Sequence, residues 1–135
     1  MSDLIIDCHG HFTTEPVEFH QFRQAQIDYV GGTRADPPMY SGVPRDDLAG
    51  IIGSNQLRLQ QERGTDVTLL SPRASGMGHH LPDVTTALSW ARLSNDTVAE
   101  ICALFPENFA GVCQLPQTEG GDLVAVIDEL RRCVA

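Results

Sequence analysis

The feature that most constrains the fold of this chain is an alternation of short apolar runs with longer helical patterns. The apolar runs lie at residues 4–8, 66–70 and 109–115, and each has the length of a β-strand. The first two show little alternation between apolar and polar residues, which predicts strands buried on both faces of a parallel sheet.

Each apolar run is followed by a segment in which apolar residues recur at helical spacing. These segments lie at residues 46–63, 85–105 and 122–134, and Gly64 and Pro106 follow the first two as stop signals. Three successive strand–helix pairs indicate an α/β protein with a parallel sheet, because parallel strands need a crossover helix between them.

One long segment departs from this alternation. Residues 12–45 are rich in glycine and proline, and we expect an irregular loop there with one helical turn between residues 18 and 29. Loops of this length in a compact domain are usually functional or disordered.

Composition excludes several classes of protein. The net charge of −9 argues against nucleic acid or an anionic membrane as the main partner, since both require a basic surface. The sequence has no apolar run of about 18 residues and no signal-peptide pattern at its start, which favours a cytoplasmic location and no membrane partner. Cys8, Cys102, Cys113 and Cys133 include no CxxC pair, so we expect free thiols rather than a disulfide framework.

The segment Asp7-Cys8-His9-Gly10-His11 has the strongest chemical signature in the chain. His9 and His11 are two residues apart at the end of a strand, so their side chains are expected to point to the same side. Two imidazoles in this arrangement suit a shared metal ion such as zinc. Asp7 could orient an imidazole, and Gly10 could leave room for the metal or a substrate.

Polar residues also follow the second and third strands, where parallel α/β folds bind their ligands. Arg73, between Ser71 and Ser75, could clamp a carboxylate with its guanidinium, although a surface ion pair is the alternative. Ser75, His79, His80 and Gln117 are further candidates for substrate contacts. The alternatives are an exposed loop for the histidines and a loop-capping role for the glutamine.

The sequence resembles a known family at several of these places. The stretches IIDCHGHFTT, QERGTDVTLLSPRAS and LFPENFAGVCQLPQ, with the His79-His80 pair, resemble the amidohydrolase superfamily. Within it, they resemble the branch of the aminocarboxymuconate semialdehyde decarboxylases and, most of all, the 4-oxalomesaconate hydratases. The resemblance covers nearly the whole chain, but the HxH motif specifies only the superfamily.

The resemblance implies a (β/α)8 TIM barrel that binds one divalent metal ion, normally zinc, with His9 and His11 as the ligands from its first strand. The remaining metal ligands and the catalytic acid or base are expected beyond residue 135. Residues 1–135 are therefore expected to be a partial domain, the N-terminal three βα units of such a barrel, since a whole barrel needs about 250 residues.

The implied activity is a lyase reaction, the metal-dependent hydration of 4-oxalomesaconate during bacterial degradation of aromatic acids such as protocatechuate and gallate. Arg73 would hold a carboxylate of this small polycarboxylate substrate. One alternative is a related decarboxylase or hydrolase acting on a small carboxylic acid. Another is a truncated fragment without activity, and we expect this 135-residue chain alone to be inactive. The sequence leaves homo-oligomerisation open.

Overall fold

A computed structural model describes residues 3–73, 76, 78, 80–81, 83–121 and 123–135. Strands β1 (Ile6–His11), β2 (Val67–Ser71) and β3 (Phe109–Gly111) form a parallel sheet in the order β1-β2-β3. This arrangement confirms the predicted α/β class. The third strand is shorter than predicted, because its ladder with β2 ends at Gly111 and residues 112–115 belong to no described strand.

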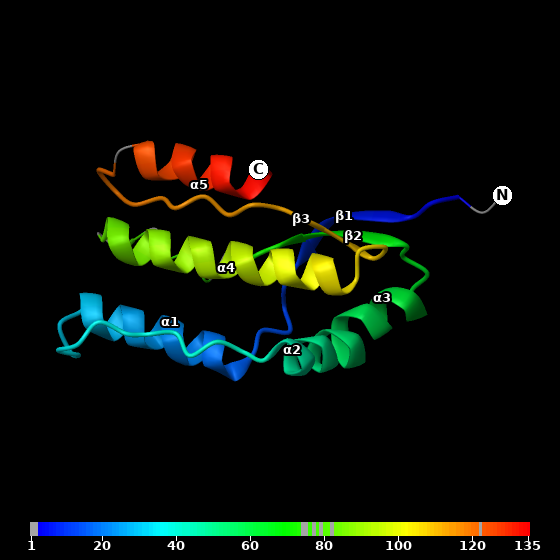
Figure 1. Cartoon of the computed structure of the whole chain (residues 1–135), viewed down its shortest axis with the longest axis horizontal. Coiled ribbons are helices and arrows are strands. Elements are labelled where there is room, and N and C mark those ends of the chain that lie inside the picture. Colours follow the sequence, from blue (N-terminus) through cyan, green and yellow to red (C-terminus); the bar gives the residue numbers. More distant parts are fainter. Residues whose placement is uncertain (1–2, 74–75, 77, 79, 82, 122) are drawn as a thin grey trace.

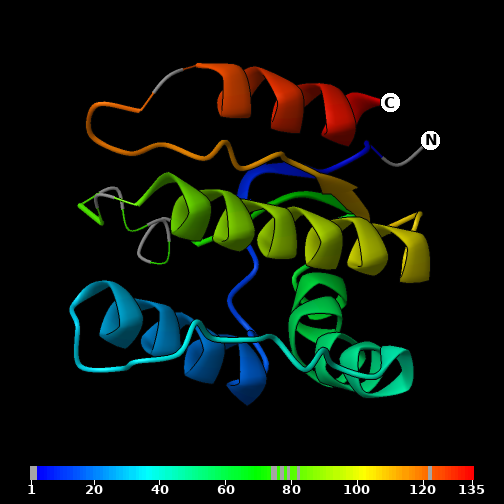
Figure 2. The same ribbon diagram turned by 60° about the vertical axis from the view of Figure 1, so that its left-hand side comes forward.

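Helical segments follow every strand. They are α1 (Val17–Val30), α2 (Arg45–Ile52), the π-helical segment η1 (Gly53–Leu57), α3 (Arg58–Glu62), α4 (Val84–Leu104) and α5 (Val124–Val134). Figures 1 and 2 show α4 in the middle of the molecule, with α1 and α2 on one side of it and α5 on the other. None of the described helices combines the length and the apolar character needed to cross a membrane.

Helix α1 is much longer than the single turn predicted within the 12–45 loop. Its buried positions are Phe19, Phe22, Arg23 and Gln26, so half of the buried face is polar. The guanidinium of Arg23 lies 4.8 Å from the centre of the Trp90 ring, and Gln26 donates a hydrogen bond to the carbonyl of Thr86. A helix that packs through a stacked arginine and a bonded glutamine lacks the apolar stripe on which the prediction depended.

A single apolar core joins the first strand, α1 and α4. Phe19 makes edge contacts with Phe12, which directly follows β1, and with Trp90 of α4. Leu70 of β2 and Ile101 of α4 are fully buried in the same cluster. The core therefore fixes the carboxyl end of β1 and the segment after it against two helices, which positions the residues of the candidate site.

Strand β1 differs from the predicted strand buried on both faces. The side chains of Ile6 to His9 are exposed, and Ile6 retains 51% of its accessible surface. The reason is the position of the strand, because β1 lies at the edge of the sheet and no described element pairs with its free side. The central strand β2 has Thr68 and Leu70 buried between half-buried neighbours.

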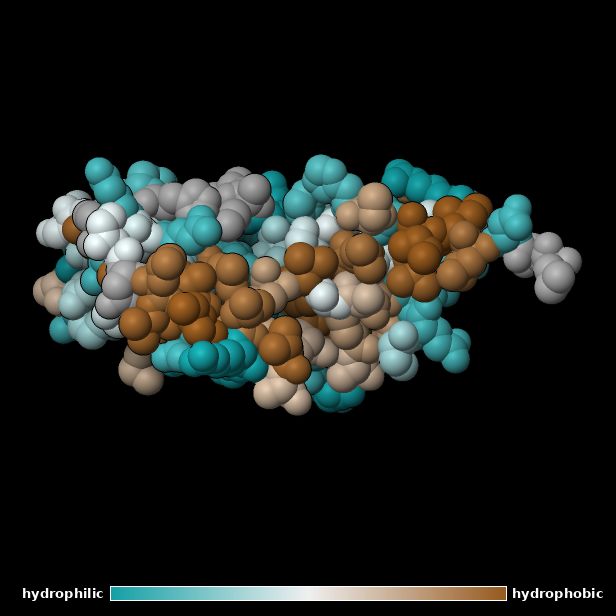
Figure 3. Space-filling view, turned by 90° about the horizontal axis from the view of Figure 1, so that it is seen from above, coloured by the Kyte–Doolittle hydropathy of each residue, from teal (hydrophilic) through white to brown (hydrophobic). Residues whose placement is uncertain are grey.

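Apolar side chains are exposed on one face of the molecule. Figure 3 shows a band of apolar residues along the side that carries α5 and the beginning of β1. Leu4 and Ile5 before β1, and Ile127 and Leu130 on α5, are among the exposed apolar residues. Contiguous apolar surface of this kind normally packs against another element, domain or chain.

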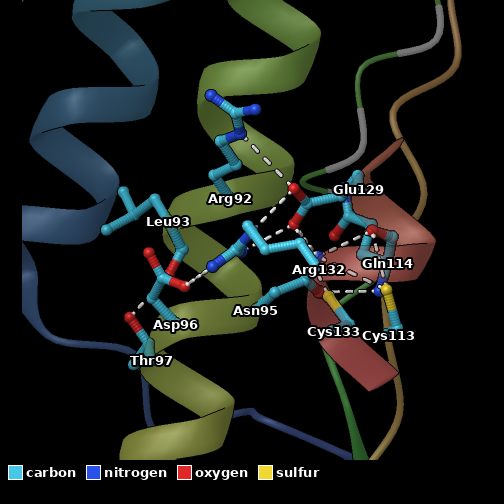
Figure 4. Close-up of polar contacts among 10 residues, drawn as sticks. All are labelled: Arg92, Leu93, Asn95, Asp96, Thr97, Cys113, Gln114, Glu129, Arg132 and Cys133. Carbon is cyan, nitrogen blue, oxygen red and sulfur yellow. Dashed lines mark hydrogen bonds and ion pairs between the residues drawn. The ribbon is translucent and has the colours of Figure 1, made fainter. Parts of the chain in front are cut away.

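A buried carboxylate joins α5 to α4 and to the segment after β3 (Figure 4). Glu129 is 0% exposed and accepts hydrogen bonds from Asn95 at 2.7 Å and from Arg132 at 2.7 and 2.9 Å, with Arg92 at 3.4 Å. Asn95 also bonds the backbone N–H and carbonyl of Gln114. Burial alone would raise the pKa of Glu129, but the bonds from Arg132 and Asn95 outweigh it and lower this pKa to about 2.

Replacing Glu129 should therefore destabilise the fold. Glu129→Gln removes a charge from a buried, hydrogen-bonded pair, and we expect a loss of about 3 kcal/mol in the free energy of unfolding, measured by urea denaturation at neutral pH. The control Asp128→Asn breaks the exposed pair with Arg131 and should change stability by less than about 1 kcal/mol.

The same carboxylate predicts a pH dependence. Because the pKa of Glu129 is lowered on folding, its contribution is complete above the unfolded value near 4.5 and is lost as the pH falls toward 2. The wild type should thus lose more stability than Glu129→Gln between about pH 5 and pH 3. Equal losses in both proteins would contradict this role of Glu129.

Candidate functional site

The two histidines predicted to share a ligand lie together at the carboxyl end of β1. The ring centres of His9 and His11 are 5.0 Å apart, with the rings edge to face. The pairing with β2 shifts between Asp7 and Gly10, which places one extra residue on β1, a β-bulge. Bulges re-aim side chains, and the simple two-residue periodicity used for the prediction gave no sign of this one.

Ser71, the last residue of β2, contacts one of the two imidazoles. Its hydroxyl donates to the carbonyl of Gly10 at 2.9 Å and lies 2.7 Å from Nδ1 of His11. A hydroxyl has one proton and a carbonyl can only accept, so Nδ1–H of His11 must be the donor in the second contact. The lone pair of His11 is then on Nε2, the form in which a histidine binds a metal ion.

The roles considered for Asp7 and Gly10 differ in the structure. The carboxylate of Asp7 accepts a hydrogen bond from the backbone N–H of His9 at 3.0 Å, so it braces the bulge, whereas Ser71 contacts an imidazole. A side chain at Gly10 would overlap the methyl group of Thr68 on β2. Gly10 therefore allows the two strands to approach, and the space beside it is filled by Thr68.

A hollow of about 430 Å³ lies beside the histidine pair, between β1 and the helical segments η1 and α3. Asp7, His9 and His11 line it together with Asn55 and Gln56 of η1. Gln56 also donates a hydrogen bond of 2.8 Å to the carbonyl of His11. Among the residues that the structure describes, no three His, Cys, Asp or Glu side chains converge as a complete metal site. The donor set here is two imidazoles, which fits part of a catalytic metal site.

Arg73 lies two residues beyond Ser71, after β2 as predicted. Its side chain is 43% exposed, and its nearest acidic group in the described part of the chain is Glu15, at 4.0 Å. The side chain of Glu15 is only 8% exposed and also lies 3.5 Å from Nε2 of His20. Burial raises the pKa of Glu15, and the charges of His20 and Arg73 reduce this rise. Sequence reasoning missed Glu15, since a single acidic residue in a polar loop gives no signal of burial.

Of the other predicted substrate contacts, the structure describes only His80 and Gln117. Ser75 and His79 lie outside the described residues. His80 is exposed. Gln117 is also exposed and lines a different cavity, of about 320 Å³, together with Val84 and Leu123 beside the first turns of α4 and α5. Their roles as substrate contacts stay predictions.

With this geometry established, comparison with known proteins defines the class. The family model described as Amidohydrolase matches residues 6–135, so the chain belongs to the amidohydrolase family. A crystal structure of 4-oxalomesaconate hydratase from Rhodopseudomonas palustris is similar to 97% of this chain and 38% of that chain, with a TM-score of 0.84 and 37% identity. These matches confirm the predicted fold, three βα units of a metal-dependent barrel.

Individual relatives fall into two groups. The chain is 44% identical over 131 residues to the 2-keto-4-carboxy-3-hexenedioate hydratase of Sphingobium sp. strain SYK-6, covering 97% of this chain and 38% of that protein. It is 37% identical over 79 residues to the γ-resorcylate decarboxylase of Rhodococcus jostii, a match that covers 58% of this chain and 23% of that protein. A dihydroxybenzoic acid decarboxylase from Polaromonas sp. JS666, solved with bound manganese, is 25% identical with a TM-score of 0.61. This match covers 98% of this chain and 35% of that chain. The chain thus spans well under half the length of these relatives.

The contact between Ser71 and His11 makes a prediction about metal affinity. Ser71→Ala removes the acceptor that keeps the proton on Nδ1, so affinity for Zn²⁺ or Mn²⁺ should fall about 10- to 100-fold. The measurement is a competition titration on the protein expressed from its complete reading frame. Thr97→Val is the control, because the Thr97 hydroxyl bonds the carbonyl of Leu93 within α4, away from the histidine pair. Equal affinities of Ser71→Ala and the wild type would refute this role of Ser71.

Proposed function

We propose that this chain is the part of a 4-oxalomesaconate hydratase that supplies two metal ligands and a substrate-binding arginine. The reaction adds water across the carbon–carbon double bond of a small unsaturated tricarboxylic keto acid. The observation that carries the proposal is the alignment of two adjacent strand ends. His11 at the end of β1 pairs with Ser71 at the end of β2, whose hydroxyl contacts His11 Nδ1, and Arg73 follows Ser71 two residues later. The 44% identity to a hydratase with a substrate of this class supports it.

His9 and His11 would hold one divalent ion, and we propose zinc because two imidazoles are typical zinc ligands. When bound, such an ion acts as a Lewis acid on a substrate oxygen or on water. The other roles belong to the chain itself. Ser71 keeps His11 in the metal-binding tautomer, and Arg73 presents its guanidinium to a substrate carboxylate.

Decarboxylation is the second candidate function. It is favoured by one observation, the 35–37% identity to γ-resorcylate decarboxylases over 79–83 residues. Those matches cover at most 62% of this chain, whereas the hydratase match covers 97%. The coverage therefore favours hydration.

An assay separates the two reactions. We expect the protein, expressed from its complete reading frame and loaded with Zn²⁺, to remove the absorbance of the conjugated keto acid without releasing CO₂. Absorbance and CO₂ are measured on the same sample, and His9→Ala serves as the inactive control. Stoichiometric CO₂ would refute hydration and establish the decarboxylase alternative.

Arg73 provides a second test of the proposal. Arg73→Ala removes charge-assisted hydrogen bonds to a substrate carboxylate, which should lower kcat/KM about 10- to 100-fold. Arg73→Lys keeps the positive charge but lacks the planar guanidinium, so its kcat/KM should lie between those of Arg73→Ala and the wild type. The control is Arg58→Ala, which breaks an exposed pair with Glu62 on α3. If Arg73→Ala is as active as Arg58→Ala, Arg73 does not bind the substrate.

A further inference from the structure

The surroundings of Arg73 contain a buried acid that the proposed function does not use. Glu15 lies in the segment between β1 and α1, with its side chain 8% exposed, and faces Arg73 from one side and His20 of α1 from the other. A buried carboxylate costs free energy unless a positive group compensates it. Its two compensating groups are Arg73, after β2, and His20 when protonated.

The backbone on either side of Glu15 is anchored. The hydroxyl of Thr14 donates to Gln56, and Gln56 in turn donates to the carbonyl of His11. On the other side, the carbonyl of Pro16 accepts from the N–H of Phe19, whose ring is in the core. Glu15 is thus held between η1 and the start of α1, whereas the side chain of Arg73 is nearly half exposed.

The distance between the two groups leaves Arg73 available for a ligand. At 4.0 Å, Glu15 attracts the guanidinium without forming a hydrogen bond to it. The Arg73 side chain donates no hydrogen bond to another described residue. The charge of Glu15 therefore orients the guanidinium, and its N–H groups stay available for an anion. The charge of Glu15 therefore restricts a long side chain whose immobilisation would otherwise cost entropy on binding.

We propose that Glu15 is the positioning residue for Arg73, holding the guanidinium at the carboxyl end of β2 with its donors free for a substrate carboxylate. This inference rests on the proposed function, in which Arg73 binds the substrate. Glu15 itself need not touch the substrate.

The test is a double-mutant cycle on the protein expressed from its complete reading frame, with KM and kcat for 4-oxalomesaconate as readouts. Glu15→Gln should raise KM about tenfold with little change in kcat, and it should have no further effect in the Arg73→Ala background. Glu15→Asp, which keeps the negative charge, should give a KM between those of Glu15→Gln and the wild type. The matched control is Glu62→Gln, which removes a charge from an exposed pair on α3. Its KM and kcat should equal those of the wild type.

The pH dependence gives a second measurement that needs no variant at Glu15. Protonation of Glu15 removes the charge that orients Arg73, so KM of the wild type should rise toward acidic pH by more than KM of Arg73→Ala, which has no guanidinium for Glu15 to orient. Parallel pH profiles, or additive effects of Glu15→Gln and Arg73→Ala, would overturn the role of Glu15. Unchanged kinetics of Arg73→Ala, or no turnover by the wild type, would instead overturn the proposed function.

Discussion

Ser71 links β2 to β1 through three contacts at the point where the candidate site begins. Its carbonyl accepts from the N–H of Phe12 at 2.7 Å, and its hydroxyl bonds the carbonyl of Gly10 and the ring of His11. Within the paired strands, Gly10 allows their close approach against Thr68. The same close pairing therefore aligns the two strand ends and holds the Ser71 hydroxyl against the His11 ring, two residues before Arg73.

Much of this architecture could be predicted from the sequence because it follows from local periodicity. The strand–helix alternation identified the parallel sheet, and Gly64, with a positive φ of 72°, ends the helical segment where predicted. His9 and His11 could be proposed as metal ligands because two imidazoles at a strand end are a typical arrangement of such ligands, and Arg73 could be proposed as a substrate contact because it follows a strand; both stay predictions. These are signals that adjacent residues in the chain carry by themselves.

The rest depends on contacts between residues far apart in the chain. Glu15 and Arg73 are 58 positions apart in the numbering (73 − 15), and they meet because the strands that precede them, β1 and β2, are paired. Helix α1 was underestimated because Arg23 and Gln26 are buried through partners on α4. The exposure of β1 depends on its edge position, which no pattern within residues 6–11 can indicate.

Two buried carboxylates show how similar burial produces different properties. Glu129 accepts hydrogen bonds from Asn95 and Arg132 at 2.7–2.9 Å, and its pKa falls to about 2 despite burial. The basic groups nearest to Glu15 in the described part of the chain, His20 and Arg73, lie 3.5 and 4.0 Å away, so burial prevails and the pKa of Glu15 rises. A carboxylate in hydrogen-bond contact with its partners stabilises the joint between α4 and α5, and it occupies the donors of those partners. A carboxylate that acts at longer range leaves its partner's donors unoccupied, which is the condition that Arg73 must meet to bind a carboxylate.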